Sequence, residues 1–105
     1  MFSGGRYFYA VFMCHLAIEK ALKGVYAKKA GKMPPKTHNL VTLLAASELQ
    51  PEEAMGKFIA KLNAASVATR YPEHLEKLQQ IYTKEVTLNI LDKTGETVSW
   101  IKKML

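Results

Sequence analysis

The longest amphipathic stretch of the sequence covers residues 6–30, and it points to a helical fold. Apolar residues recur there at alternating spacings of four and three, which places them on one face of an α-helix. Gly31 supplies a stop, and Pro34 and Pro35 prevent continuation because proline lacks the backbone donor and pushes the preceding residue out of helical geometry. The apolar face consists of Phe8, Val11, Phe12, Ile18, Leu22, Val25 and Tyr26.

Turn-forming residues divide the middle of the chain into two more helices. We expect Thr37 to cap a short second helix, which a turn at residues 47–50 follows. Pro51 at the first helical position opens a third helix, and Pro72 ends it. The expected inner faces carry Leu40, Leu43 and Leu44 in the second helix, and Met55, Phe58, Ile59, Leu62 and Ser66 in the third.

The end of the chain predicts one last helix. We expect residues 73–82 to form a loop with at most one or two helical turns, after which Thr83 caps a helix that tolerates Gly95 as a weak point. No segment alternates with period two for long enough to be a strand. The sequence therefore predicts an all-α fold, an antiparallel up-and-down bundle of about four helices in one domain, residues 1–105. The stripe of the last helix is Thr87, Leu91, Thr94, Val98, Ile101 and Leu105.

Charge and cysteine content limit the classes of function. The formal net charge of +6 favours anionic partners, although lysines such as Lys28, Lys29, Lys32 and Lys36 equally suit solvated helix faces. Cys14 is the single cysteine, which excludes an intrachain disulfide, and we expect it to pack on its helix. No apolar run approaches the length of a membrane span, so we expect a cytoplasmic protein without membrane contact.

Two ionisable residues stand on the apolar face of the first helix. His15 and Glu19 lie four residues apart and are close enough for a hydrogen bond. Burying such groups is costly unless they are paired, so we expect partners across the bundle or a cavity. The pair either fixes the packing of the helices or belongs to a ligand site. Lys20 and Lys23 flank it and either reach a phosphate or point into water.

A second group of candidates follows the third helix at residues 69–74. Arg70 suits a phosphate or carboxylate, and Tyr71 offers a flat face to a base, although both also suit a structural lock at the helix end. A metal site is not expected, because His38 and His74 lie in separate segments without further ligands at a suitable spacing.

Three sequence blocks resemble the HEPN domain family. Gly-Arg-Tyr-Phe-Tyr-Ala at residues 5–10 leads into His-Leu-Ala-Ile-Glu-Lys-Ala-Leu-Lys at 15–23. Pro-Lys-Thr-His-Asn-Leu follows at 35–40, and Thr-Arg-Tyr-Pro-Glu at 69–73. The resemblance implies an up-and-down bundle, frequent homodimers and contact with a nucleotide or RNA. It also implies association with a minimal nucleotidyltransferase, often as the two halves of a toxin-antitoxin operon.

The chain departs from the family at two points. Ribonucleases of the family use an Arg and a His separated by four to six residues that face each other across a dimer. Here three residues, with Pro72 among them, separate Arg70 from His74, so that pattern is not met. Relatives also have a helix before the first block, and without it we expect an open apolar groove that a second copy or a partner helix covers.

These observations favour a non-catalytic HEPN binding module that needs no cofactor. We expect a homodimer that partners a minimal nucleotidyltransferase or holds a nucleotide or RNA. One alternative is a metal-independent ribonuclease toxin with Arg70 as phosphate stabiliser and His74 as general acid and base. Another is a basic adaptor without a small ligand. The candidate nucleotide- or partner-binding residues are His15, Glu19, Lys20, Lys23, His38, Arg70 and Tyr71.

Overall fold

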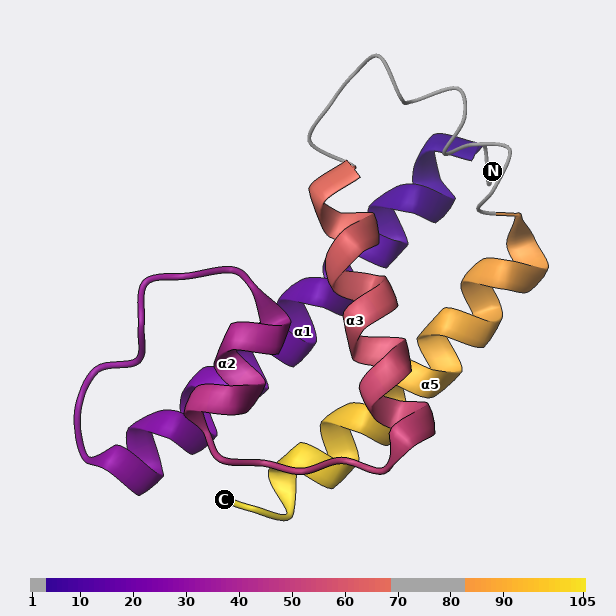
Figure 1. The fold of residues 1–105 in the computed structure, drawn as a ribbon. Helices are drawn as coiled ribbons and strands as arrows, with labels where there is room; N and C mark the ends of the chain where they lie inside the picture. The colour runs from indigo at the N-terminus through magenta and orange to yellow at the C-terminus, as the bar shows by residue number, and fades with distance from the viewer. Residues whose placement is uncertain (1–3, 69–82) are drawn as a thin grey trace.

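The computed structural model describes residues 4–68 and 83–105, and these residues form helices without any strand (Figure 1). This confirms the all-α prediction. None of the helices in these two ranges is long and apolar enough to span a membrane. The elements are α1 at Gly4–Ala30, α2 at Leu40–Ala46, α3 at Glu53–Ala68 and α5 at Lys84–Lys102.

α1 is the helix against which the others pack. It contacts α2, α3 and α5, and α2 also contacts α3. Most of its predicted inner face is confirmed, since Val11, Ile18, Leu22 and Val25 are buried and Phe12 and Tyr26 are half-buried. The side chain of Phe8 lies outside the described residues. The core is one cluster made of Val11, Cys14, Ile18, Leu22 and Val25 of α1, Leu40 and Leu43 of α2, Leu49 of the connection between α2 and α3, Ile59 and Leu62 of α3, and Ile101 of α5.

α1 and α5 lie side by side and run in the same direction (Figure 1). The side chain of Cys14 is hydrogen-bonded to that of Thr94. A Cβ atom at Gly24, almost three turns further along α1, would lie 3.8 Å from the side chain of Leu105, which follows α5. Because the two contacts advance together along both helices, the pair is parallel.

α3 runs opposite to this pair. Met55 near its beginning and Thr97 in the second half of α5 line the same hollow. Ala65 near its end lines another hollow with Val86 at the beginning of α5. The long helices therefore alternate in direction, which confirms the up-and-down bundle.

The cap of α2 differs from the prediction. The N-cap is Asn39, whose side chain accepts a hydrogen bond from the backbone N–H of Thr42 at 3.0 Å. Thr37, the predicted cap, instead accepts from the N–H of Asn39 at 3.1 Å. Thr and Asn are both common N-cap residues. Here Thr37 stabilises the turn before the helix, and Asn39, two residues later, is the cap.

The beginning of α3 also lies later than predicted. Pro51 stands two residues before the helix instead of at its first position. The carbonyl of Glu52 accepts the first helical hydrogen bond, from the N–H of Gly56 at 2.9 Å. The ring of Pro51 folds beside Gly56, where a Cβ atom would lie 3.7 Å from it. The proline thus fixes the approach to the helix without belonging to it.

α5 begins as predicted and buries most of the predicted stripe, since Thr87, Thr94 and Ile101 are buried and Val98 is half-buried. Thr83 is its N-cap and accepts from the N–H of Val86. Leu91 and Leu105 are exposed, whereas Thr97 is buried. Thr97 suits this place because its hydroxyl donates to the carbonyl of Lys93 at 2.8 Å, so burial leaves no polar atom unpaired.

Candidate functional site

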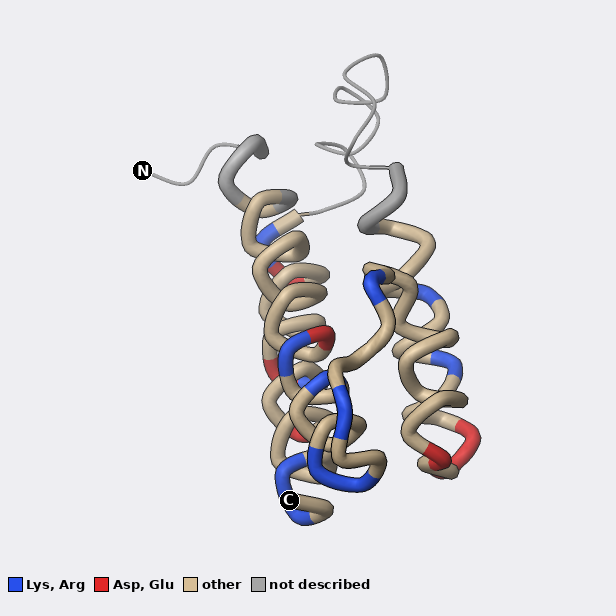
Figure 2. Tube along the Cα trace, turned by 90° about the vertical axis from the view of Figure 1, so that its left-hand side faces the viewer, with Lys and Arg blue, Asp and Glu red and all other residues tan. Residues whose placement is uncertain are grey.

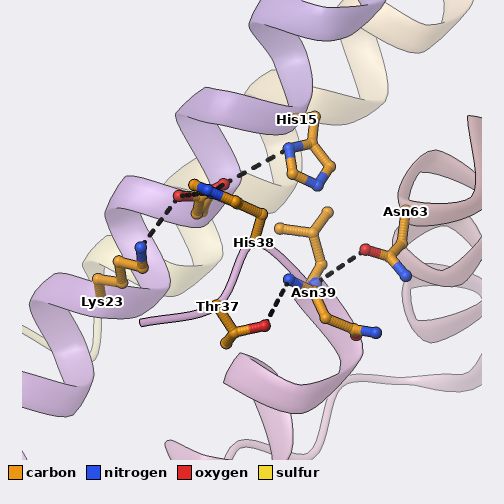
Figure 3. Close-up of polar contacts among 8 residues, drawn as sticks. His15, Lys23, Thr37, His38, Asn39 and Asn63 are labelled. Carbon is orange, nitrogen blue, oxygen red and sulfur yellow. Dashed lines mark hydrogen bonds and ion pairs between the residues drawn. The ribbon is translucent and has the colours of Figure 1, made fainter. Parts of the chain in front are cut away.

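The carboxylate of Glu19 is the centre of a polar cluster to which Lys23 and His38 contribute, and Figure 3 shows these two side chains close together. Glu19 is only 5% exposed. Its oxygens lie 2.9 and 3.1 Å from Nδ1 of His38, and Oε2 accepts a hydrogen bond from Nζ of Lys23 at 3.1 Å. A buried carboxylate is costly unless charge-assisted bonds satisfy it, and these two partners do so. We call Glu19, Lys23 and His38 the Glu19 cluster.

Local structure brings the three residues together. Lys23 follows Glu19 by one helical turn, so both side chains lie on the same face of α1. His38 comes from the segment that returns toward α1 after Pro34 and Pro35. α3 supports that segment, because Oδ1 of Asn63 accepts a hydrogen bond from the N–H of Leu40 at 3.0 Å. The turn and the start of α2 are therefore fixed from two sides.

The surroundings of Glu19 hold it in the ionised form. Burial alone raises its pKa, but the hydrogen bonds from His38 and Lys23 and their positive charge outweigh burial, so the pKa of Glu19 lies below its ordinary value. An ionised carboxylate only accepts hydrogen bonds, which requires Nδ1 of His38 to carry the proton. The other ring nitrogen, Nε2, is then the atom left for a ligand.

His15 is buried beside Glu19, as its spacing predicts, but it is not hydrogen-bonded to that residue. It is buried, with 2% of its surface exposed, so the predicted burial of both residues is confirmed. Its Nδ1 lies 3.7 Å from Oε1 of Glu19, which is too long for a hydrogen bond and gives an ion pair only when the ring is protonated. Glu19 thus directs its hydrogen bonds to His38 and Lys23.

The structure gathers part of the predicted site. His15, Glu19, Lys23 and His38 lie together, whereas Lys20 is exposed on the same helix. The side chain of His38 remains 63% exposed despite its bond to Glu19. No group of three or more potential metal ligands occurs among the residues that were placed. The candidates Arg70, Tyr71 and His74 lie outside the described residues.

The sequence pattern does not reveal the pairing of His38 with Glu19. The two residues are nineteen positions apart, and no periodic pattern connects a helix with the loop that follows it. The available signal was the two prolines after Gly31, which reverse the chain and bring residues 36–39 back along α1.

Lysines gather at one end of the molecule (Figure 2). The last turns of the parallel helices α1 and α5 carry Lys28, Lys29 and Lys102. The ammonium group of Lys28 contacts the backbone oxygen of Leu105, which joins the two ends. Cations at helix C-termini also offset the helix dipoles. We call the lysine end the set made of these three residues and of two that closely follow the helices in the sequence: Lys28, Lys29, Lys32, Lys102 and Lys103.

Comparison with known proteins gives one match. The family model of the HEPN domain matches residues 1–104. A search of curated proteins and a search of solved structures gave no match. The matched region includes every helix described above and the whole Glu19 cluster.

Proposed function

The chain belongs to the HEPN domain family, and we propose that it acts as a non-catalytic binding module for a nucleotide or an RNA phosphate. The observation that carries this proposal is the Glu19 cluster. One buried carboxylate holds two cationic or protonatable side chains at the surface, with Lys23 half-buried and His38 largely exposed. Lys23 donates to a phosphate directly, and His38 donates through Nε2 when its ring is protonated at both nitrogens.

The charge around the cluster supports the same ligand class. The lysine end begins less than two helical turns beyond Lys23 and continues into the loop that carries His38. An anion that approaches this surface gains from several lysines before it contacts the cluster. We include Arg70 and Tyr71 in the proposed site on the strength of the sequence alone.

Binding can be tested by calorimetry with nucleoside triphosphates and a short single-stranded RNA. We expect Lys23→Ala combined with His38→Ala to weaken binding at least tenfold. The control is Lys57→Ala, because Lys57 forms a similar i,i+4 pair with Glu53 that is exposed on α3. An effect of the control equal to that of the double variant would contradict the proposal. The same holds if no nucleotide or RNA binds.

We further propose that the protein forms a homodimer and pairs with a minimal nucleotidyltransferase in a toxin-antitoxin system. Tyr9 and Met13 of α1 are 62% and 49% exposed, and Leu88 and Leu91 of the neighbouring α5 are 54% and 44% exposed. Apolar side chains exposed on two adjacent helices suit a self-complementary contact. Met13→Glu with Leu91→Glu should give a monomer in analytical ultracentrifugation, and an unchanged mass would exclude this face.

Expression in bacteria distinguishes binding from ribonuclease activity. A non-catalytic module is not expected to cleave RNA, so growth and total RNA should stay intact when the chain is expressed alone. Growth arrest that His74→Ala relieves would overturn the proposal in favour of the enzyme, with Arg70 and His74 as its catalytic residues.

A further inference from the structure

A groove runs between α3 and α5, away from the Glu19 cluster. Its central cavity of about 300 Å³ is lined by Phe58, Leu62 and Ala65 from α3 and by Val86 and Ile90 from α5. A smaller hollow of about 100 Å³ adjoins it beside Met55 and Thr97, and a third, wider hollow follows the outer side of α3. The three hollows share Phe58 and Lys93.

The length of the groove favours a helix over a small molecule. The lining residues of α3 extend from Ala54 to Ala65, which corresponds to about 17 Å along the helix at 1.5 Å per residue. The two hollows that follow each other along the groove match side chains that project from one face of a docked helix every three or four residues. The apolar lining matches the apolar stripe of such a helix.

The charges along the groove restrict the partner further. Two lysines, Lys61 and Lys93, line the central cavity, and no acidic residue lines it with them. At the other end the hollow beside Met55 is lined by Glu52 and Glu96. A bound helix is therefore favoured when its acidic residues lie over the lysines and its basic residues lie over the glutamates.

We propose that the groove between α3 and α5 binds an amphipathic helix of a partner protein, acidic where it crosses Lys61 and Lys93. Acidic residues are most favourable in the first turns of a helix and basic residues in the last. The bound helix therefore begins beside Val86 and ends beside Glu96, antiparallel to α3. This surface is separate from the nucleotide site proposed above and does not depend on it.

Two synthetic peptides test the proposal. Each contains about 15 residues, enough for four helical turns, with the same leucine stripe. The acidic peptide carries glutamates in its first half and lysines in its second half, and the basic peptide carries lysines throughout. Fluorescence anisotropy should show saturable binding of the acidic peptide, and at least tenfold weaker binding of the basic one. Equal binding of both peptides, or no binding of either, would overturn the proposal.

Charge reversal in the protein separates recognition from an effect on folding. Lys61→Glu with Lys93→Glu should lose the acidic peptide and gain the basic one, a reversal that a misfolded variant does not show. Val86→Glu should weaken binding at least tenfold. Ser99→Glu is the matched control, because Ser99 is exposed on the same helix, lines none of the three hollows and lies outside the proposed dimer face. An equal loss in both single variants would place the contact elsewhere. A change of mass with Val86→Glu would mean that a second copy covers the groove.

Discussion

Glu19 connects α1 to the segment before α2 through a single buried charge. Replacing it by glutamine keeps the shape but removes the negative charge that pairs with Lys23 and His38. We expect Glu19→Gln to lower the free energy of unfolding by about 1–3 kcal/mol at neutral pH. Urea titration followed by circular dichroism measures this difference. His38→Ala should cost less, about 1 kcal/mol or below, because that ring is largely exposed.

The lowered pKa of Glu19 also predicts a pH dependence. A carboxyl group whose pKa is lower in the folded chain stabilises it fully above the unfolded pKa, near 4.5, and this contribution is lost as the pH falls through the folded pKa. The wild-type protein should therefore lose stability below pH 4.5 more steeply than Glu19→Gln. Parallel curves for the two proteins would show that Glu19 does not carry this dependence.

At the scale of the helices, mutations at the start of α2 can show whether Asn39, as in the structure, or Thr37, as the sequence pattern predicts, is the N-cap. Asn39→Ala should destabilise the protein by about 1 kcal/mol, because the N–H of Thr42 loses its acceptor. Thr37→Ala removes only a turn contact outside the helix and should cost less. Thermal unfolding of both variants measures the difference. A larger loss of stability with Thr37→Ala than with Asn39→Ala would indicate that Thr37 is the cap.

Two glycines should respond to alanine in opposite directions. Gly95 lies inside α5 with nothing within 4 Å of an added Cβ atom, so Gly95→Ala should stabilise the protein by about 0.5–1 kcal/mol. Gly31 follows α1 with φ of 66°, a conformation that alanine adopts only at a cost. Gly31→Ala should therefore destabilise by about 1 kcal/mol. Melting temperatures that shift in the same direction would refute this assignment of the two glycines.

The helices were predictable from the sequence because each has a local cause. The stripe of α1 and its stop at Gly31 depend on nearby residues only, and so does the cap at Thr83. The incorrect predictions concern positions for which two nearby residues are equally suitable. Thr37 and Asn39 are both good caps, and Leu91 and Thr97 both fit a helical stripe in α5, so tertiary packing selects between them.

At the scale of the whole molecule, the candidate site was predictable only in part. The burial of Glu19 followed from its place on the apolar face of α1. Its bond to His38 did not, because that contact depends on how a loop returns across the helix. The groove between α3 and α5 likewise requires knowledge of which helices pair, which the periodicity of either helix does not contain.

The central position of α1 predicts how the fold opens. Because α2, α3 and α5 all contact α1, its middle can be released only by complete unfolding, whereas α2 is a short helix held by fewer neighbours. Amide hydrogen exchange should be slowest around Ile18 and Leu22, at the rate of global unfolding, and faster throughout α2. Exchange of equal speed in α1 and α2 would indicate that the bundle opens as one unit.

The parallel arrangement of α1 and α5 has a practical outcome for handling the protein. A purification tag attached after Leu105 emerges beside Lys28, next to the surface proposed to receive phosphates. The first residue of α1 is at the other end of a molecule whose longest dimension is 42 Å (Figure 1). Affinity measurements should therefore use an amino-terminal tag, and a polyhistidine or acidic extension at the carboxyl terminus is expected to alter them.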